Sequence, residues 1–138
     1  PVFLLETGRF VLSGVAIEHK IADKFHQKIL QDPSNISAIE LEYFKVTSTQ
    51  VTSSIFKHWN LSDSLVDMIK YADDLEKAPE HYKKEVQILN VVKTICNVTD
   101  PLGDQFVEEG LAKAKEFGLD TRHLEKAIER MQDRVLEE

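Results

Sequence analysis

Hydrophobic residues recur at intervals of three and four along most of this 138-residue chain. Such spacing is typical of amphipathic α-helices, whereas a strand would alternate apolar and polar positions. We find no alternating stretch flanked by hairpin-type turns. The pattern therefore predicts an all-α fold built as a compact multi-helix domain.

Two helices are expected before residue 33. The opening segment, residues 1–17, is apolar apart from Glu6 and Arg9, and we interpret it as a core helix. The next helix is predicted from Val15 to Leu30, about four turns long, and the Asp32-Pro33 pair ends it because proline disfavours a helical residue before it. Its apolar face comprises Ile17, Ile21, Ala22, Phe25 and Ile29.

Three short helices are expected next. Ser37 and Glu40 have the spacing of a capping box, in which each side chain binds a free backbone N–H of the first turn, with Ile36 and Leu41 as the flanking hydrophobic pair. Thr47-Ser48-Thr49-Gln50 repeats this pattern and predicts a second start, and Asn60 or Ser62 caps a third helix. The second helix is predicted to bury Val51, Ile55, Phe56 and Trp59, and the third Leu65, Val66, Met68 and Ile69.

The last third of the chain predicts three more helices. Pro79 suits a first helical turn, and the helix after it is expected to be the longest and most buried. Another runs from Asp104 to Phe117, with Gly118 as its C-terminal cap. Asp120 or Thr121 caps the final helix. Predicted inward residues are Ile88, Leu89, Val92, Ile95 and Cys96 in the first of these helices, and Leu124, Ile128, Met131 and Val135 in the last.

Composition narrows the classes of function. A hydrophobic content of 42% suits a single domain, residues 1–138, with its own core. The formal net charge of −7 leaves no basic footprint for nucleic acid. The single cysteine, Cys96, cannot form an intramolecular disulfide and is expected to be an inert, buried thiol in the cytoplasm. No signal peptide or membrane span is predicted, so we expect no membrane partner.

One stretch, from Glu40 to Asp74, carries a recognisable set of spacings: a Glu, then Trp-x-Leu (Trp59 and Leu61), then Ile-x-Tyr (Ile69 and Tyr71). Together with an upstream segment, Phe3 to Arg9, it resembles the HD-related output domain (HDOD) family of bacterial signalling proteins, over roughly Phe3 to Cys96. The resemblance implies the HD/HDOD helical fold. It also suggests the C-terminal part of a larger HDOD protein, since the upstream motif begins at Phe3.

At the positions where the family has its motif histidines and metal-binding residues, this chain has residues of other types. Ser48 is at the family's His position, Thr52 at a small Gly, and Ala72 and Asp73 at paired His residues, while Leu5 and Glu6 replace the His-Asp pair of true HD phosphohydrolases. Leu5 and Ala72 cannot ligate a metal, and Ser48 is a poor substitute for imidazole. The resemblance therefore implies a non-catalytic module of bacterial signal transduction that binds a protein partner. No catalytic, metal or cofactor-binding residue is assigned, and no cofactor is expected.

A different class of function remains as an alternative: a metal-dependent phosphohydrolase of nucleotides or cyclic dinucleotides. Its ligands would come from His19, Asp23, His26 and Asp73. The first three would share one face of a continuous helix, because they are spaced i, i+4 and i+7. A polar face that only serves solubility gives the same pattern, and we favour that interpretation.

Other conspicuous residues receive structural interpretations. His58 is expected to face solvent and Trp59 to anchor helix packing, while Glu40 is explained by its capping box. An apolar strip near the start of the chain predicts a possible homodimer, because large exposed apolar patches are normally covered and a two-fold interface is self-complementary. The strip comprises Val2, Phe3, Leu4, Phe10, Val11 and Leu12.

Overall fold

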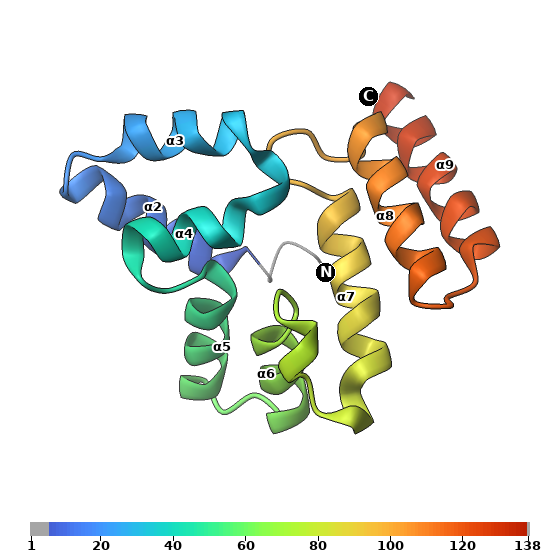
Figure 1. Ribbon diagram of the computed structural model, residues 1–138, viewed down its shortest axis with the longest axis horizontal. Coiled ribbons are helices and arrows are strands. Elements are labelled where there is room, and N and C mark those ends of the chain that lie inside the picture. Colours follow the sequence, from blue (N-terminus) through green and yellow to red (C-terminus); the bar gives the residue numbers. More distant parts are fainter. Residues whose placement is uncertain (1–5, 138) are drawn as a thin grey trace. The chain divides into compact units, whose positions relative to one another are not determined.

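The computed structural model describes residues 6–137, which contain α-helices and short 3-10 helices but no strand (Figure 1). The all-α prediction is confirmed. The α-helices are α2 (Thr7–Glu18), α3 (Ala22–Gln31), α4 (Ile36–Phe44), α5 (Ser48–His58), α6 (Asp63–Lys70), α7 (Lys83–Ile95), α8 (Asp104–Glu116) and α9 (Thr121–Glu137). The 3-10 helices are η1 (Pro33–Asn35), η2 (Leu75–Lys77) and η3 (Glu80–Tyr82). Within this described part, none of the helices has the length and apolarity needed to cross a membrane.

Tertiary contacts divide the chain into two units within α7, the first ending at Leu89 and the second beginning at Asn90. The first unit contains two apolar clusters, one between α5 and α6 and one between α3 and α4. The members of the first cluster are Phe56, Val66 and Ile69, and those of the second are Phe25, Ile29, Ile36 and Ile39. The single-domain organisation expected from the sequence stays a prediction.

The second unit has a core of its own, made by the end of α7 with α8 and α9. Its buried members are Val91, Ile95, Ala114 and Ile128. Gly110 lets α8 approach α7 closely, because a Cβ atom at this position would lie 2.3 Å from Cγ1 of Ile95. Each unit therefore buries apolar side chains independently.

The predicted helix from Val15 to Leu30 is wrong. The chain turns at Lys20, whose φ of 58° is left-handed, and the amides of Lys20 and Ile21 bind the carbonyls of Ile17 and Ala16. This arrangement is a Schellman motif, which ends a helix and satisfies its last carbonyl groups. Ile17 is consequently 68% exposed rather than inward.

The predicted capping box of Ser37 and Glu40 is also wrong. α4 begins at Ile36, and its N-cap residue Asn35 makes no capping hydrogen bond. Leu41 is exposed, so it is not the inner half of a hydrophobic pair. The side chain of Glu40 is instead buried, and it accepts hydrogen bonds from the Arg9 side chain and the Ser48 amide.

The start of α5 is as predicted. Thr47 Oγ1 accepts a hydrogen bond from the Gln50 amide at 3.2 Å, and the Gln50 side chain accepts one from the Thr47 amide at 2.9 Å. These reciprocal bonds satisfy two free donors of the first turn. α5 therefore begins at a position fixed by its own sequence.

The end of α5 differs from expectation. Asn60 has a φ of 56° and follows the last turn as a left-handed cap, and Ser62, the N-cap residue of α6, makes no side-chain capping bond. Trp59 is 59% exposed, so it is not the core anchor predicted; its ring stacks on the buried Phe56 with centroids 6.0 Å apart. His58 is exposed, as predicted.

α8 and α9 begin where predicted, but two predictions for α7 are wrong. It begins at Lys83, after the 3-10 helix that follows Pro79, and its 13 residues make it shorter than α9, which has 17. Gly118 caps α8 with a φ of 72°, and Asp120 Oδ1 accepts from the Arg122 amide at 3.0 Å at the start of α9. The Arg122 side-chain hydrogen bond lowers the pKa of Asp120. Of the residues expected inward in α7 and α9, only Ile95 and Ile128 are buried. The partly exposed ones are Leu89, Val92, Cys96 and Leu124, and the exposed ones are Ile88, Met131 and Val135; Leu65 of α6 is exposed as well.

Candidate functional site

Buried polar side chains gather in the first unit around the N-terminus of α5. They are Glu40, Thr47, Ser48, Thr49, Thr52 and Ser53. A buried polar group costs free energy unless it has hydrogen-bonding partners. The contacts of this group therefore indicate what holds α2, α4 and α5 together.

Glu40 is the centre of these contacts. Its side chain is 0% exposed, and Oε2 accepts a hydrogen bond from the Ser48 amide at 2.7 Å. That amide is one of the free donors in the first turn of α5, where the helix dipole also favours a negative charge. The carboxylate of α4 thus caps the N-terminus of α5 from outside the helix.

Arg9, on α2, provides the positive charge beside Glu40. Its Nε lies 3.4 Å from Glu40 Oε1, its Nη1 pairs with Glu6, and its Nη2 lies 3.4 Å from Ser48 Oγ. A guanidinium group can reach several acceptors at once because its donors form a planar fork. We call Glu6, Arg9, Glu40 and Ser48 the Arg9 cluster.

The backbone of α2 touches α5 at Gly8. The Gly8 amide donates to Thr52 Oγ1 at 2.8 Å, and the same hydroxyl donates to the Ser48 carbonyl at 2.8 Å. A Cβ atom at Gly8 would lie only 2.0 Å from the Ser48 carbonyl oxygen. Only glycine permits this approach, which places the Arg9 side chain over the start of α5.

A further link joins the start of α5 to the segment after α6. Thr49 Oγ1 donates to Asp73 Oδ2 at 3.0 Å, and Thr47 Oγ1 lies 3.0 Å from Thr49 Oγ1. Ala72, next to Asp73, is fully buried. The segment following α6 is thereby held against the first turn of α5.

The positions that the family resemblance singled out lie close together here. Arg9 binds Glu6, Glu40 and Ser48, and the Gly8 amide binds Thr52. Asp73 binds Thr49 in the same turn of α5. Leu5 lies outside the described residues, as do Val2, Phe3 and Leu4 of the predicted apolar strip. Of the rest of that strip, Phe10 and Val11 are exposed but Leu12 is buried. Sequence reasoning gave Arg9 no role here, although a basic residue three positions after Glu6 on a helix is a recognisable pairing signal.

The alternative metal ligands do not share a helical face, so that expectation is wrong. His19 is the C-cap residue of α2, whereas Asp23 and His26 lie on α3, beyond the left-handed turn at Lys20. Among residues 6–137, no group of three or more His, Cys, Asp or Glu side chains is arranged to hold a metal ion. Asp73 belongs to the Thr49 contact instead.

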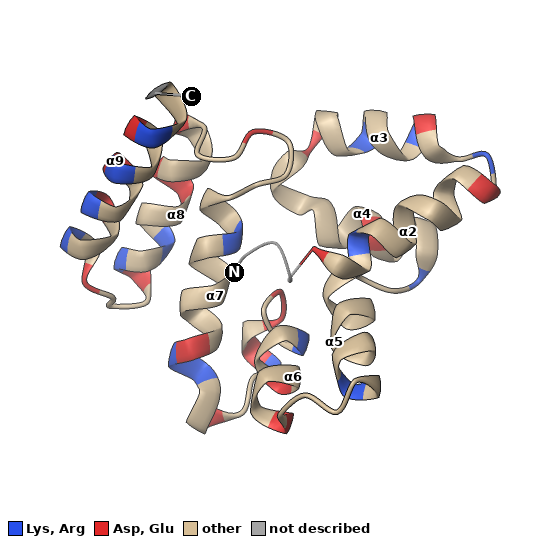
Figure 2. Ribbon diagram, turned by 180° about the vertical axis from the view of Figure 1, so that it is seen from behind, with Lys and Arg blue, Asp and Glu red and all other residues tan. Residues whose placement is uncertain are grey.

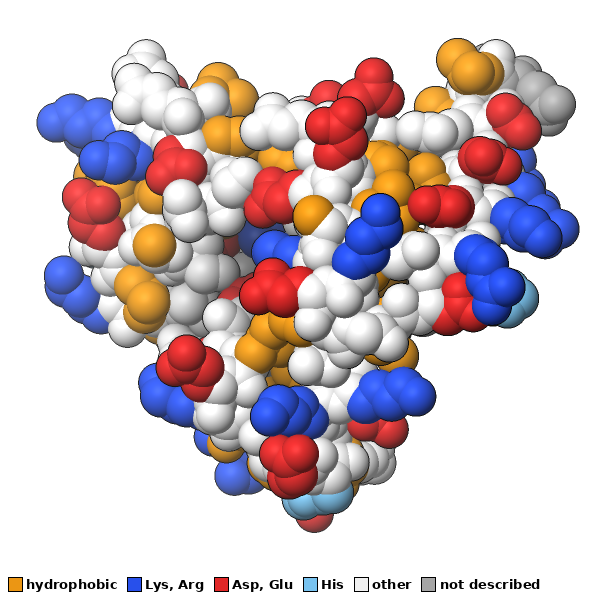
Figure 3. All heavy atoms as spheres, turned by 45° about the vertical axis from the view of Figure 1, so that its right-hand side comes forward, with side chains coloured by type: hydrophobic (Ala, Val, Ile, Leu, Met, Phe, Trp, Pro, Cys, Tyr) orange, Lys and Arg blue, Asp and Glu red, His pale blue; other side chains and the backbone are white. Residues whose placement is uncertain are grey.

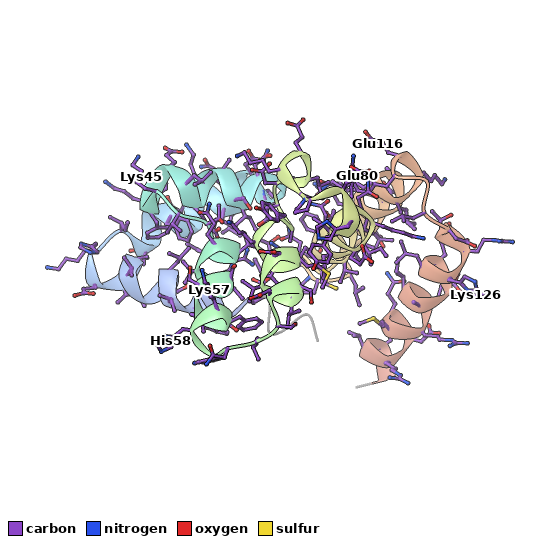
Figure 4. The ribbon with its side chains drawn as sticks, turned by 90° about the horizontal axis from the view of Figure 1, so that it is seen from below. Lys45, Lys57, His58, Glu80, Glu116 and Lys126 are labelled. Carbon is purple, nitrogen blue, oxygen red and sulfur yellow. The ribbon has the colours of Figure 1, made fainter. Side chains whose placement is uncertain are left out.

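A second feature of the first unit is an open groove along α5 and α6, with a volume of about 940 Å³. Its apolar lining includes Val51, Ile55, Val66 and Trp59. Figure 4 shows Lys57 and His58 side by side near the C-terminal end of α5. The remaining lining residues are Val46, Gln50, Ser53, Ser54, Asp63, Asp67 and Lys70.

Comparison with known proteins gives a likeness of fold. No protein-family model matches the chain, and no curated protein matches it. The crystal structure of a virulence factor from Campylobacter jejuni superposes with a TM-score of 0.62 and 20% sequence identity, covering 84% of this chain. The chain spans 44% of the length of that protein. At this identity the likeness shows the fold alone.

Proposed function

We propose that this chain is a non-catalytic module of bacterial signal transduction that acts in the cytoplasm by binding a protein partner. The observation that carries the proposal is the Arg9 cluster, which lies where the resemblance to HDOD proteins would locate ligand chemistry. Here the carboxylates of Glu6 and Glu40 bind protein groups.

The donor set of the cluster does not suit a catalytic metal ion. Both oxygens of Glu40 accept hydrogen bonds, from Arg9 and from the Ser48 amide. A metal ion would have to displace these donors, and it would be repelled by the positive guanidinium group of Arg9. The cluster is better suited to holding helices together than to activating water.

The residues at the family's histidine positions also support the proposal. Ser48 is buried, its amide donates to Glu40 and its Oγ accepts from Arg9, while Ala72 has no ligating atom in its side chain. Hydrolysis by HD-type proteins needs several imidazole and carboxylate ligands around one or two metal ions. On this proposal, a module without these ligands signals by presenting a surface to a protein partner.

A hydrolysis assay tests this proposal. The full chain is incubated with Mn²⁺ or Fe²⁺ and with bis(p-nitrophenyl) phosphate or a cyclic dinucleotide, beside a Glu40→Gln variant checked for helicity by circular dichroism. We expect the two proteins to give the same background rate, and elemental analysis after dialysis to find less than stoichiometric metal. Metal-dependent turnover by the wild type that Glu40→Gln abolishes would show that the module is an enzyme.

A further inference from the structure

The groove of α5 and α6 combines an apolar lining with an exposed aromatic anchor. Val51, Ile55 and Val66 contribute apolar surface, and Trp59, which also lines the groove, has more than half of its surface exposed. Tryptophan is the residue type most enriched among the energetic centres of protein interfaces. An exposed Trp beside an apolar groove therefore indicates a docking surface.

The charged side chains of the groove are evenly divided in sign. Lys57 comes from α5, whereas Asp63, Asp67 and Lys70 come from α6. Within residues 6–137, Lys57, Asp63 and Asp67 form no ion pair, although other charged residues of the chain do. Their charges are available to a partner.

The net negative charge of the chain favours association through the groove rather than through other surfaces. With a net charge of −7, two copies repel each other over most of their surfaces. Acidic and basic positions are dispersed along the helices (Figure 2), and one face of the surface shows both signs interspersed (Figure 3). The groove carries two cations and two anions, so the two copies can meet there without net repulsion.

We propose that this groove docks a second copy of the chain across a two-fold axis, which rests on the proposed function as a protein-binding module. In this arrangement α5 of each copy packs against α6 of the other, and Lys57 of each faces Asp63 and Asp67 of the other copy. Each Trp59 enters the other groove. A two-fold interface requires that one patch carry both the anchor and its receptor, and this groove carries both.

The test measures association by sedimentation equilibrium and light scattering, with Lys57→Glu and Asp63→Lys/Asp67→Lys as separate charge reversals. Each variant alone sets like charges across the axis and is expected to raise the dimer dissociation constant about tenfold or more. An equimolar mixture of the two restores opposite charges at both ends of the interface. We expect heterodimers in the mixture with near wild-type affinity.

Two further measurements sharpen the result. Trp59 is the single tryptophan of the chain, so its fluorescence emission is expected to shift to longer wavelength as the wild type is diluted from dimer to monomer. Phe10→Asp is the matched control, because Phe10 is 65% exposed on α2 and is not among the residues that line the groove. We expect it to leave the dissociation constant unchanged.

A wild type that stays monomeric at high concentration would overturn this inference. So would a dimer that is insensitive to both charge reversals, or one weakened by Phe10→Asp alone, which would favour the α2 surface. These outcomes are distinct from failure of the proposed function, which is decided by hydrolysis. A monomer that hydrolyses nothing leaves a protein-binding module with a different partner.

Discussion

Arg9 joins three helices through one side chain. It pairs with Glu6 on its own segment, with the fully buried Glu40 of α4, and with Ser48 at the start of α5. A buried charge without a partner is strongly destabilising, so a pair of this kind is indispensable once one member is present. The stability of the first unit therefore depends on both members of the pair.

We predict that Arg9→Met destabilises the chain by about 3 kcal/mol, because it leaves the carboxylate of Glu40 buried without its cation. Urea denaturation followed by circular dichroism measures the change. Adding Glu40→Gln to this variant removes the unpaired charge, so the double variant should be more stable than the sum of the two single effects. Strict additivity of the two substitutions would mean that Arg9 and Glu40 do not interact.

Sequence reasoning at this scale succeeded where a signal was local. The capping pattern of Thr47 and Gln50 was correct because both partners lie within one turn of each other. The same reasoning failed for Glu40, whose partners Arg9 and Ser48 lie on other helices. Trp59 was assigned to the core because large aromatic residues are usually buried, but α5 ends beside it and Asn60 turns the chain with a positive φ.

At the scale of helices, three of the turns use the same left-handed cap. Lys20, Asn60 and Gly118 all follow a last helical turn and donate their amides back to it. Gly118 could be predicted because glycine adopts this conformation without strain, and asparagine tolerates it. Lys20 could not, because lysine carries no signal for a positive φ, and the apolar spacing of Ile17, Ile21 and Phe25 runs on through the turn.

Lys20→Gly is therefore predicted to stabilise the chain by about 1 kcal/mol, since glycine avoids the contact of Cβ with the backbone at φ of 58°. Lys24→Gly provides the matched control. Lys24 is exposed within α3, so glycine there should cost about 1 kcal/mol of helix stability. Thermal denaturation of both variants measures these changes. If Lys20→Gly proved as destabilising as Lys24→Gly, the result would contradict the Schellman geometry.

At the scale of the whole chain, tertiary contacts define two units, and the boundary between them falls within α7. The sequence predicted the order and class of the helices, because helical spacing and caps are local. It could not predict the division, since Leu89 and Val91 lie only two residues apart on α7 but pack into different clusters. Which cluster an apolar residue joins depends on tertiary packing that its spacing does not encode.

Gly110→Ala tests whether the two units unfold separately. The added methyl group would collide with Ile95, and overpacking of this kind costs roughly 1 to 3 kcal/mol. We expect hydrogen exchange to lose protection in α8 and α9 while α2 to α5 keep theirs, because locally cooperative units open independently. An equal loss of protection throughout would show one cooperative domain, as the composition suggested.

If the Arg9 cluster stands in place of a metal site, as proposed, the folding of the first unit does not depend on the supply of metal ions. Domains held together by a bound metal unfold when chelators remove it, and their folding follows the supply of that metal and the protonation of its ligands. A guanidinium group is synthesised with the chain and keeps its charge over the whole physiological range. On the proposed function, the first unit is therefore expected to assemble without a loading step after translation, under metal starvation as readily as under abundance.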